Sequence, residues 1–206
     1  ILLSKLSLFA ESYKDWIEDQ KAKTSTEHDQ RIPENLIRAQ NYIYNRIVKN
    51  IKYLEENAQA MFCFRLANTA MMMQMVIARD TRFKKARHLS DIPDNDCFDR
   101  IGFFEDYPSD DHHGKTITRY RPFQLAFLLM NIEPTFNKQS VDRNEKVDLI
   151  WFPTGGGKTE AYLALTALTI IERRINNTEA KGISVLMRYT LRLLTAQQFE
   201  RATWLI

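Results

Sequence analysis

Residues 147–160 read Val-Asp-Leu-Ile-Trp-Phe-Pro-Thr-Gly-Gly-Gly-Lys-Thr-Glu, and this stretch decides the expected fold. An apolar run ends at Pro153 and Thr154, three glycines follow, and Lys158 and Thr159 then open an amphipathic segment. A short apolar run bounded by proline and glycine predicts a buried strand, whereas apolar residues at intervals of three and four predict a helix. The stretch therefore predicts a strand, a tight glycine turn and the start of a helix.

The three glycines have the chemistry of a phosphate-binding turn. Backbone N–H groups must approach a polyphosphate closely, and glycine allows the required dihedral angles with no Cβ in the way. The free N–H groups and the dipole at the start of the next helix attract an anion. Lys158 can reach the β and γ phosphates of ATP, and the Thr159 hydroxyl can bind Mg²⁺, so these two are the candidate catalytic residues. The predicted nucleotide site comprises Thr154, Gly155, Gly156, Gly157, Lys158, Thr159 and Glu160.

This pattern resembles the phosphate-binding loop of P-loop NTPases, with one departure. The motif GxxxxGK[ST] would place a glycine at position 152, where this chain has Phe152. The loop Pro153-Thr154-Gly155 is similar to the variant loop of superfamily 2 helicases. The alternative interpretation is a glycine-rich turn that happens to precede a Lys-Thr pair.

Length and composition set the class of protein. A chain of 206 residues fits one ordinary domain or two small ones, and its hydrophobic content of 44% with 27% charged residues is globular. The opening segment is too short and interrupted to span a membrane, and Cys63 and Cys97 have no disulfide or metal-site spacing, so we expect a cytoplasmic protein with no membrane association. The chain lacks an initial methionine and stops inside a helical pattern, which we interpret as a piece of a larger protein.

The chain divides into three expected regions. Residues 1–87 form a helical N-terminal region, with an amphipathic helix over 1–20, a polar loop over 21–31 and a long helical stretch from about residue 34 that breaks at an unspecified point. Residues 88–115 form an acidic, loop-rich junction. Residues 116–206 form the first part of an α/β, RecA-like lobe with a parallel sheet.

Within this last region the sequence predicts five elements and one polar loop. The expected elements are a helix over 118–132, strands over 147–152 and 183–187, a helix ending near residue 176 and a last helix beginning at Thr190; residues 134–146 are expected to form the loop.

Upstream of the glycine turn, Arg121-Pro-Phe-Gln124 resembles the element that precedes the ATP loop in Swi/Snf-like and related superfamily 2 enzymes. That resemblance implies that the Gln124 amide pairs with the adenine edge through its donor and its acceptor, and that Tyr120 or Arg121 stacks on the base. The alternative is a glutamine at a helix start that faces solvent.

Downstream, the segment that starts at residue 185 resembles the first nucleic-acid motif of superfamily 2 helicases. Thr190 at a helix N-terminus is suited to a DNA phosphate, with Arg188 and Arg192 supplying positive charge. The net charge of the chain is +3, and this end holds an excess of basic residues, which favours an anionic partner there. The alternative is that these arginines pair with acidic residues of a neighbouring domain.

The three strings together, from Arg-Pro-Phe-Gln-Leu-Ala-Phe through Trp-Phe-Pro-Thr-Gly-Gly-Gly-Lys-Thr-Glu to Leu-Met-Arg-Tyr-Thr-Leu-Arg, are similar to the helicase subunit of DISARM anti-phage systems, the DrmA family. The resemblance implies a bacterial cytoplasmic ATPase that acts on phage DNA with a DrmB-type partner subunit. The acidic Mg²⁺-binding pair, the second motor lobe and its arginine finger are missing. We therefore expect this chain alone to bind nucleotide weakly without hydrolysing it.

The sequence is also compatible with two other functions. A P-loop phosphotransferase acting on a small molecule would need a lid and an acceptor pocket, for which the sequence offers no candidate. A structural module would use its nucleotide site only to order a complex with its partner.

Overall fold

The structure is a computed structural model that describes residues 1–26, 34–79, 119–153, 155–179, 181–188 and 199–203. Regular secondary structure within those ranges is helical throughout. The helices are α1 (Leu2–Thr26), α2 (Glu34–Glu56), α3 (Ala58–Arg79), α6 (Pro122–Met130), α7 (Ile132–Phe136), α8 (Val141–Glu145) and α9 (Lys158–Asn176), and residues 199–203 are also helical.

The predicted parallel sheet of a RecA-like lobe is wrong, because the described residues contain no β-strand. Residues 147–152, called the extended segment below, and residues 183–187 have no regular secondary structure, and neither segment pairs its backbone with another described segment. The first segment is a nearly continuous apolar run, but Val147, Leu149 and Trp151 are 97%, 82% and 89% exposed. An apolar run becomes a strand only when a neighbouring chain segment completes the hydrogen-bond ladder and covers its faces.

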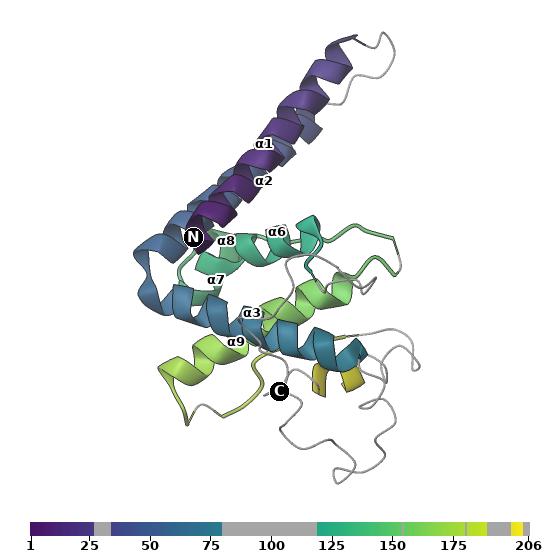
Figure 1. The fold of residues 1–206 in the computed structure, drawn as a ribbon. Helices are drawn as coiled ribbons and strands as arrows, with labels where there is room; N and C mark the ends of the chain where they lie inside the picture. Colours follow the sequence, from purple (N-terminus) through teal and green to yellow (C-terminus); the bar gives the residue numbers. More distant parts are fainter. Residues whose placement is uncertain (27–33, 80–118, 154, 180, 189–198, 204–206) are drawn as a thin grey trace.

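Helices α1 and α2 lie side by side and form an arm that projects from the rest of the molecule (Figure 1). The helix predicted over 1–20 is confirmed and continues to Thr26, so the first part of the predicted loop over 21–31 is wrong. Ile47, Ile51 and Leu54 recur at three- and four-residue intervals on α2 and are buried, as an amphipathic helix requires.

The long helical stretch predicted from residue 34 breaks at Asn57, between α2 and α3. The Asn57 side-chain oxygen accepts a hydrogen bond from the Ala60 backbone N–H at 2.8 Å. This bond caps the start of α3, because the first N–H groups of a helix have no partner within the helix. The confirmed break therefore has a local cause in one side chain. Residues 80–118, including the whole predicted acidic junction over 88–115, lie outside the described residues.

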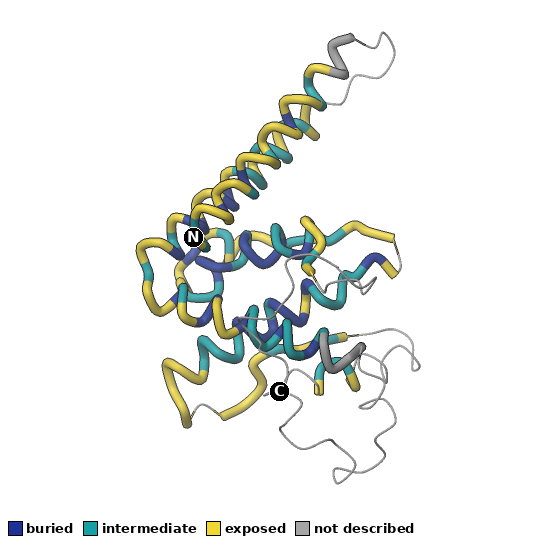
Figure 2. The backbone as a smooth tube through the Cα atoms, in the orientation of Figure 1, coloured by how far each residue is buried: buried dark blue, intermediate teal, exposed yellow. Residues whose placement is uncertain are grey.

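A single hydrophobic core joins the N-terminal helices to the helices on either side of the glycine residues. Helix α3 packs along α9, and α6 packs against both α2 and α9 (Figures 1 and 2). The largest fully buried apolar side chains come from all of these elements and include Ile47, Leu54, Met71, Leu128, Leu129, Ile132, Leu163 and Leu168. The core thus fixes the starts of α6 and α9 relative to each other.

The region between α6 and the glycine turn differs from the expectation. Residues 134–146 were predicted to be a polar loop, but α7 covers its beginning and α8 its end. Glu133 on α7 is buried and accepts hydrogen bonds from Ser140 at 2.6 Å and from Asn137 at 2.8 Å. These short-range bonds order a segment that composition alone marks as a loop. Among the described helices, none combines the length and apolar character needed to cross a membrane.

Candidate nucleotide-binding site

The glycine turn (residues 155–157) joins the extended segment to α9 and is built on left-handed backbone. Gly155 has φ 77° and Gly157 has φ 88°, a region that disfavours any residue with a Cβ. The Gly156 N–H donates to the Pro153 carbonyl at 3.1 Å and closes the turn. Gly157 is the N-cap of α9 and has no side chain that could cap the helix, so within the described residues this helix start has no side-chain cap. The tight turn predicted for the three glycines is therefore present.

Lys158 lies over the carbonyl groups that precede the turn. Its Nζ donates to the Phe152 carbonyl at 2.6 Å and to the Pro153 carbonyl at 3.0 Å. The ammonium group is therefore held at the mouth of the turn by two neutral acceptors. Charge-assisted bonds to phosphate oxygens are stronger than such neutral bonds, so an entering phosphate can take over this cation.

Phe152 gives the departure from the P-loop motif a physical explanation. Its ring stacks on Phe123 of α6 with centroids 4.3 Å apart and an interplanar angle of 19°. A Cβ added at Gly156 would lie 2.4 Å from the Phe152 ring and 2.9 Å from the Pro153 carbonyl oxygen. The ring occupies the space that a side chain at 156 would need. It joins the turn to α6, which a glycine at position 152 could not do.

Two side chains from the start of α6 contact the glycine turn directly. The Arg121 guanidinium donates to the Gly156 carbonyl at 3.0 Å, and the Gln124 amide donates to the Gly157 carbonyl at 2.7 Å. The Gln124 oxygen accepts the Arg121 backbone N–H at 2.7 Å, which caps α6. Gln124 is only 4% exposed. The structure thus brings Gln124 and Arg121 to the turn, and both polar atoms of the Gln124 amide have backbone partners, so the predicted contacts of these residues with an adenine base stay a prediction.

Glu160 lies in the first turn of α9 and joins it to the C-terminal helical residues. One of its carboxylate oxygens pairs with the Arg201 guanidinium. The other oxygen is buried and has no hydrogen-bond partner among the described residues. Burial lowers the pKa of Arg201. Sequence reasoning placed Glu160 in the site but missed Arg201, because no local pattern connects residues 41 positions apart.

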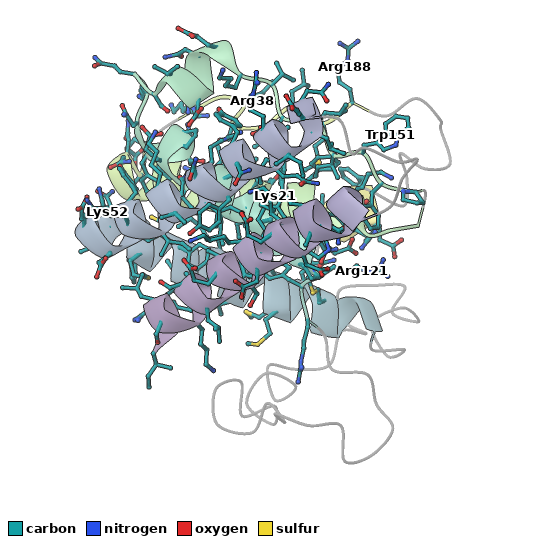
Figure 3. The ribbon with its side chains drawn as sticks, turned by 90° about the horizontal axis from the view of Figure 1, so that it is seen from above. Lys21, Arg38, Lys52, Arg121, Trp151 and Arg188 are labelled. Carbon is teal, nitrogen blue, oxygen red and sulfur yellow. The ribbon has the colours of Figure 1, made fainter. Side chains whose placement is uncertain are left out.

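The remaining predicted residues fall into three groups. Tyr120 packs against the hydrophobic core, and its hydroxyl is buried without a partner among the described residues, which raises its pKa well above the ordinary value. Thr159 is partly buried at the start of α9, beside Lys158. Arg188 is exposed, stands at the edge of the molecule in Figure 3, and borders a cavity of about 440 Å³ against α9. Thr154, Thr190 and Arg192 lie outside the described residues.

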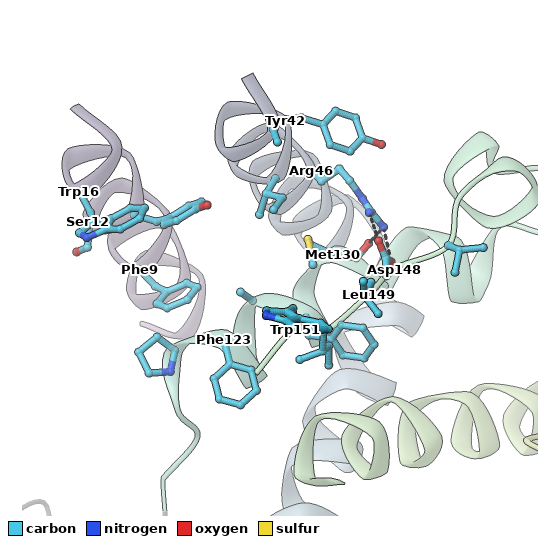
Figure 4. A pocket seen from close by; sticks show the side chains of 18 residues that line it. Phe9, Ser12, Trp16, Tyr42, Arg46, Phe123, Met130, Asp148, Leu149 and Trp151 are labelled. Atoms are coloured by element: carbon cyan, nitrogen blue, oxygen red, sulfur yellow. Dashed lines mark hydrogen bonds and ion pairs between the residues drawn. The ribbon is translucent and has the colours of Figure 1, made fainter. Parts of the chain in front are cut away.

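The extended segment before the turn is anchored on α2. The Arg46 guanidinium donates to both carboxylate oxygens of Asp148, at 2.6 and 3.0 Å, and also to the Met130 carbonyl (Figure 4). Burial alone would lower the pKa of Arg46, but the hydrogen bond and charge of Asp148, with the charge of Asp142, raise it. This ion pair was not predicted, since the two residues lie 102 positions apart. It fixes the direction in which the chain enters the glycine turn.

An aromatic groove of about 890 Å³ runs beside this anchor, between α1, α2, α6 and the extended segment. Aromatic rings form much of its wall, with Phe9 and Trp16 on α1, Tyr42 on α2, Phe123 on α6 and Trp151 on the extended segment (Figure 4). Neither Gln124 nor the glycine turn lines it. The groove is therefore a separate feature from the candidate phosphate site.

The site as built can hold a polyphosphate. It offers uncapped helix N–H groups, a lysine ammonium and two left-handed glycines, all of which suit an anion. The described residues contain no cluster of three His, Cys, Asp or Glu side chains that could hold a metal ion by themselves.

Comparison with known proteins finds a sequence similarity over nearly the whole chain. The chain is 35% identical to the DISARM protein DrmA of Bacillus paralicheniformis over 207 aligned residues, which cover 97% of this chain. The chain is similar to DrmA. This supports the resemblance indicated by the sequence strings around Gln124, Lys158 and Arg188. The chain spans 16% of the length of DrmA. No protein-family model matches the chain.

Proposed function

We propose that the glycine turn and the start of α9 bind the triphosphate of ATP together with Mg²⁺. The observation that carries this proposal is the uncapped α9 N-terminus, preceded by two left-handed glycines and covered by the Lys158 ammonium. In a bound complex the amides of residues 155–157 and the Lys158 side chain would hold the phosphates, and the Thr159 hydroxyl would hold Mg²⁺. The metal would neutralise charge on the phosphate oxygens.

For the whole protein, we propose an ATP-dependent DNA translocase or helicase subunit of a bacterial anti-phage defence system. The similarity to the DISARM protein DrmA supports the defence assignment. The ATP site proposed above would supply the energy, and Arg188 with Thr190 and Arg192 are the proposed contacts to DNA phosphates. A DrmB-like subunit is the proposed protein partner. Contacts with phosphates alone carry no sequence information, so we expect DNA affinity that falls steeply with salt.

DNA-stimulated ATP hydrolysis by the full-length protein tests this proposal. We expect Lys158→Ala to lower the stimulated rate at least about a hundredfold, because the cation that binds the transferred phosphate is lost. Lys181→Ala is the matched control, since Lys181 is exposed and remote from the turn in sequence. Retention of activity by Lys158→Ala with loss of complex assembly would replace the motor with a nucleotide-ordered scaffold. Hydrolysis that DNA does not stimulate would favour a phosphotransferase.

A further inference from the structure

Two side chains of α6 hold the carbonyl side of the glycine turn. The Arg121 guanidinium binds the Gly156 oxygen at 3.0 Å and the Gln124 amide binds the Gly157 oxygen at 2.7 Å. We propose that Arg121 and Gln124 are positioning residues that aim the N–H groups of Gly157 and Lys158 at a bound phosphate. This inference rests on the proposed triphosphate site and assigns the residues that preorganise it.

The geometry of the peptide bond supplies the reason. The carbonyl of Gly156 and the N–H of Gly157 belong to one planar trans unit, in which they point in opposite directions. The carbonyl of Gly157 and the N–H of Lys158 are related in the same way. Hydrogen bonds that hold the two oxygens against α6 therefore leave the two N–H groups facing away from α6. The bonds fix the direction of two phosphate donors without touching the phosphate.

The three glycines make such positioning necessary. Glycine has the largest backbone freedom of any residue, so fixing its backbone has the largest cost in conformational entropy. A free turn would incur this cost when the phosphate binds. A turn already fixed by Arg121, Gln124 and the Phe123–Phe152 stack has incurred it on folding, so binding is tighter.

The burial of Gln124 separates this role from recognition of the base. Gln124 is 4% exposed, its amide nitrogen binds Gly157 and its oxygen binds the Arg121 N–H. An adenine ring would have to displace both bonds, and displacing the first would release the turn that holds the phosphates. We therefore infer that loss of the Gln124 amide weakens binding of the phosphate chain itself, whatever base is attached.

Calorimetric titration of the 206-residue chain tests this with three ligands in the presence of Mg²⁺: ATP, GTP and inorganic tripolyphosphate. The variants are Gln124→Met, which keeps the side-chain volume, and Arg121→Met, whose side chain is exposed and whose loss should not impair folding. The matched controls are the exposed residues Gln139 and Arg65, each changed to Met. We expect each α6 variant to lose about tenfold in affinity for all three ligands, which corresponds to about one hydrogen bond. The controls should bind like the wild type.

A second measurement needs no ligand. The backbone order parameters of the Gly157 and Lys158 amides should be those of rigid backbone in the wild type and should fall in Gln124→Met. Unchanged order parameters, or a Gln124→Met protein that loses affinity for ATP while binding tripolyphosphate normally, would overturn the inference and leave the proposed function standing. A wild-type chain that binds none of the three ligands would overturn both.

Discussion

Apolar side chains are buried in the helical core but exposed in the extended segment. Leu168 on α9 is completely buried, whereas Leu149 on the extended segment is 82% exposed. Both belong to apolar runs that sequence patterns alone assign to a folded interior. The glycine turn joins these two regions of the molecule. Its supports are the helices α2, α6 and α9.

The supports are specific contacts. Arg46 holds the extended segment through Asp148, Phe123 holds Phe152, and the start of α6 holds two carbonyl groups of the turn. A glycine turn can therefore be ordered by helices through hydrogen bonds and ring stacking. The exposed apolar residues of the extended segment contribute little to that order.

The comparison is sharpest when the same substitution is made in each region. We expect Leu168→Ala to lower the free energy of unfolding by about 3 kcal/mol, because it removes buried methyl groups and leaves a cavity in the core. Leu149→Ala should change it by less than about 0.5 kcal/mol, since that side chain is exposed. Urea unfolding followed by circular dichroism measures both. Equal losses in the two variants would mean that the extended segment is as well packed as the core.

Removing the ion pair between Arg46 and Asp148 should have the next largest effect on the free energy of unfolding. Arg46→Met leaves the Asp148 carboxylate without its partner in a partly buried place, and we expect a loss of about 2 kcal/mol in the free energy of unfolding. Asp148 keeps some exposure to solvent, so the loss should be smaller than for a fully buried pair. Arg38→Met on the exposed face of α2 is the control (Figure 3). An Arg46 variant as stable as the Arg38 variant would show that the ion pair does not hold the segment.

A substitution in the glycine turn should have a smaller effect on stability but a strong effect on the affinity for MgATP. An alanine at position 156 would bring its Cβ against the Phe152 ring and the Pro153 carbonyl oxygen, and the carbonyl cannot move without changing the turn. We expect Gly156→Ala to lower the free energy of unfolding by about 1 kcal/mol and the affinity for MgATP by at least about tenfold. Gly182→Ala, where φ is +96° and the nearest atom is 3.7 Å from the new Cβ, is the control. It should lose stability through backbone strain while binding MgATP normally.

Sequence reasoning succeeded where the cause is local. The helices that became α1, α2 and α9 follow from apolar residues spaced three and four apart, and the glycine turn follows from three adjacent glycines before Lys158. The sheet could not be decided in this way, because an apolar run such as 147–152 becomes a strand only with a distant partner.

In the candidate site too, contacts between residues far apart in the sequence could not be predicted. The resemblance to helicases drew attention to Gln124, which the structure places against Gly157, 33 positions away. It gave no sign that the bond runs to a backbone carbonyl. The pairs Arg46–Asp148 and Glu160–Arg201 join residues 102 and 41 positions apart, and no spacing rule predicts such pairs.

The central claim is that the glycine turn and Lys158 bind a triphosphate, and amide chemical shifts measured by NMR during titration with MgATP test it most directly. We predict that the largest shifts occur at residues 155–160 and at Arg121 and Gln124, and that Lys158→Ala abolishes them. Shifts centred on the aromatic groove around Phe9, Trp16 and Trp151, with residues 155–160 unaffected, would contradict the claim.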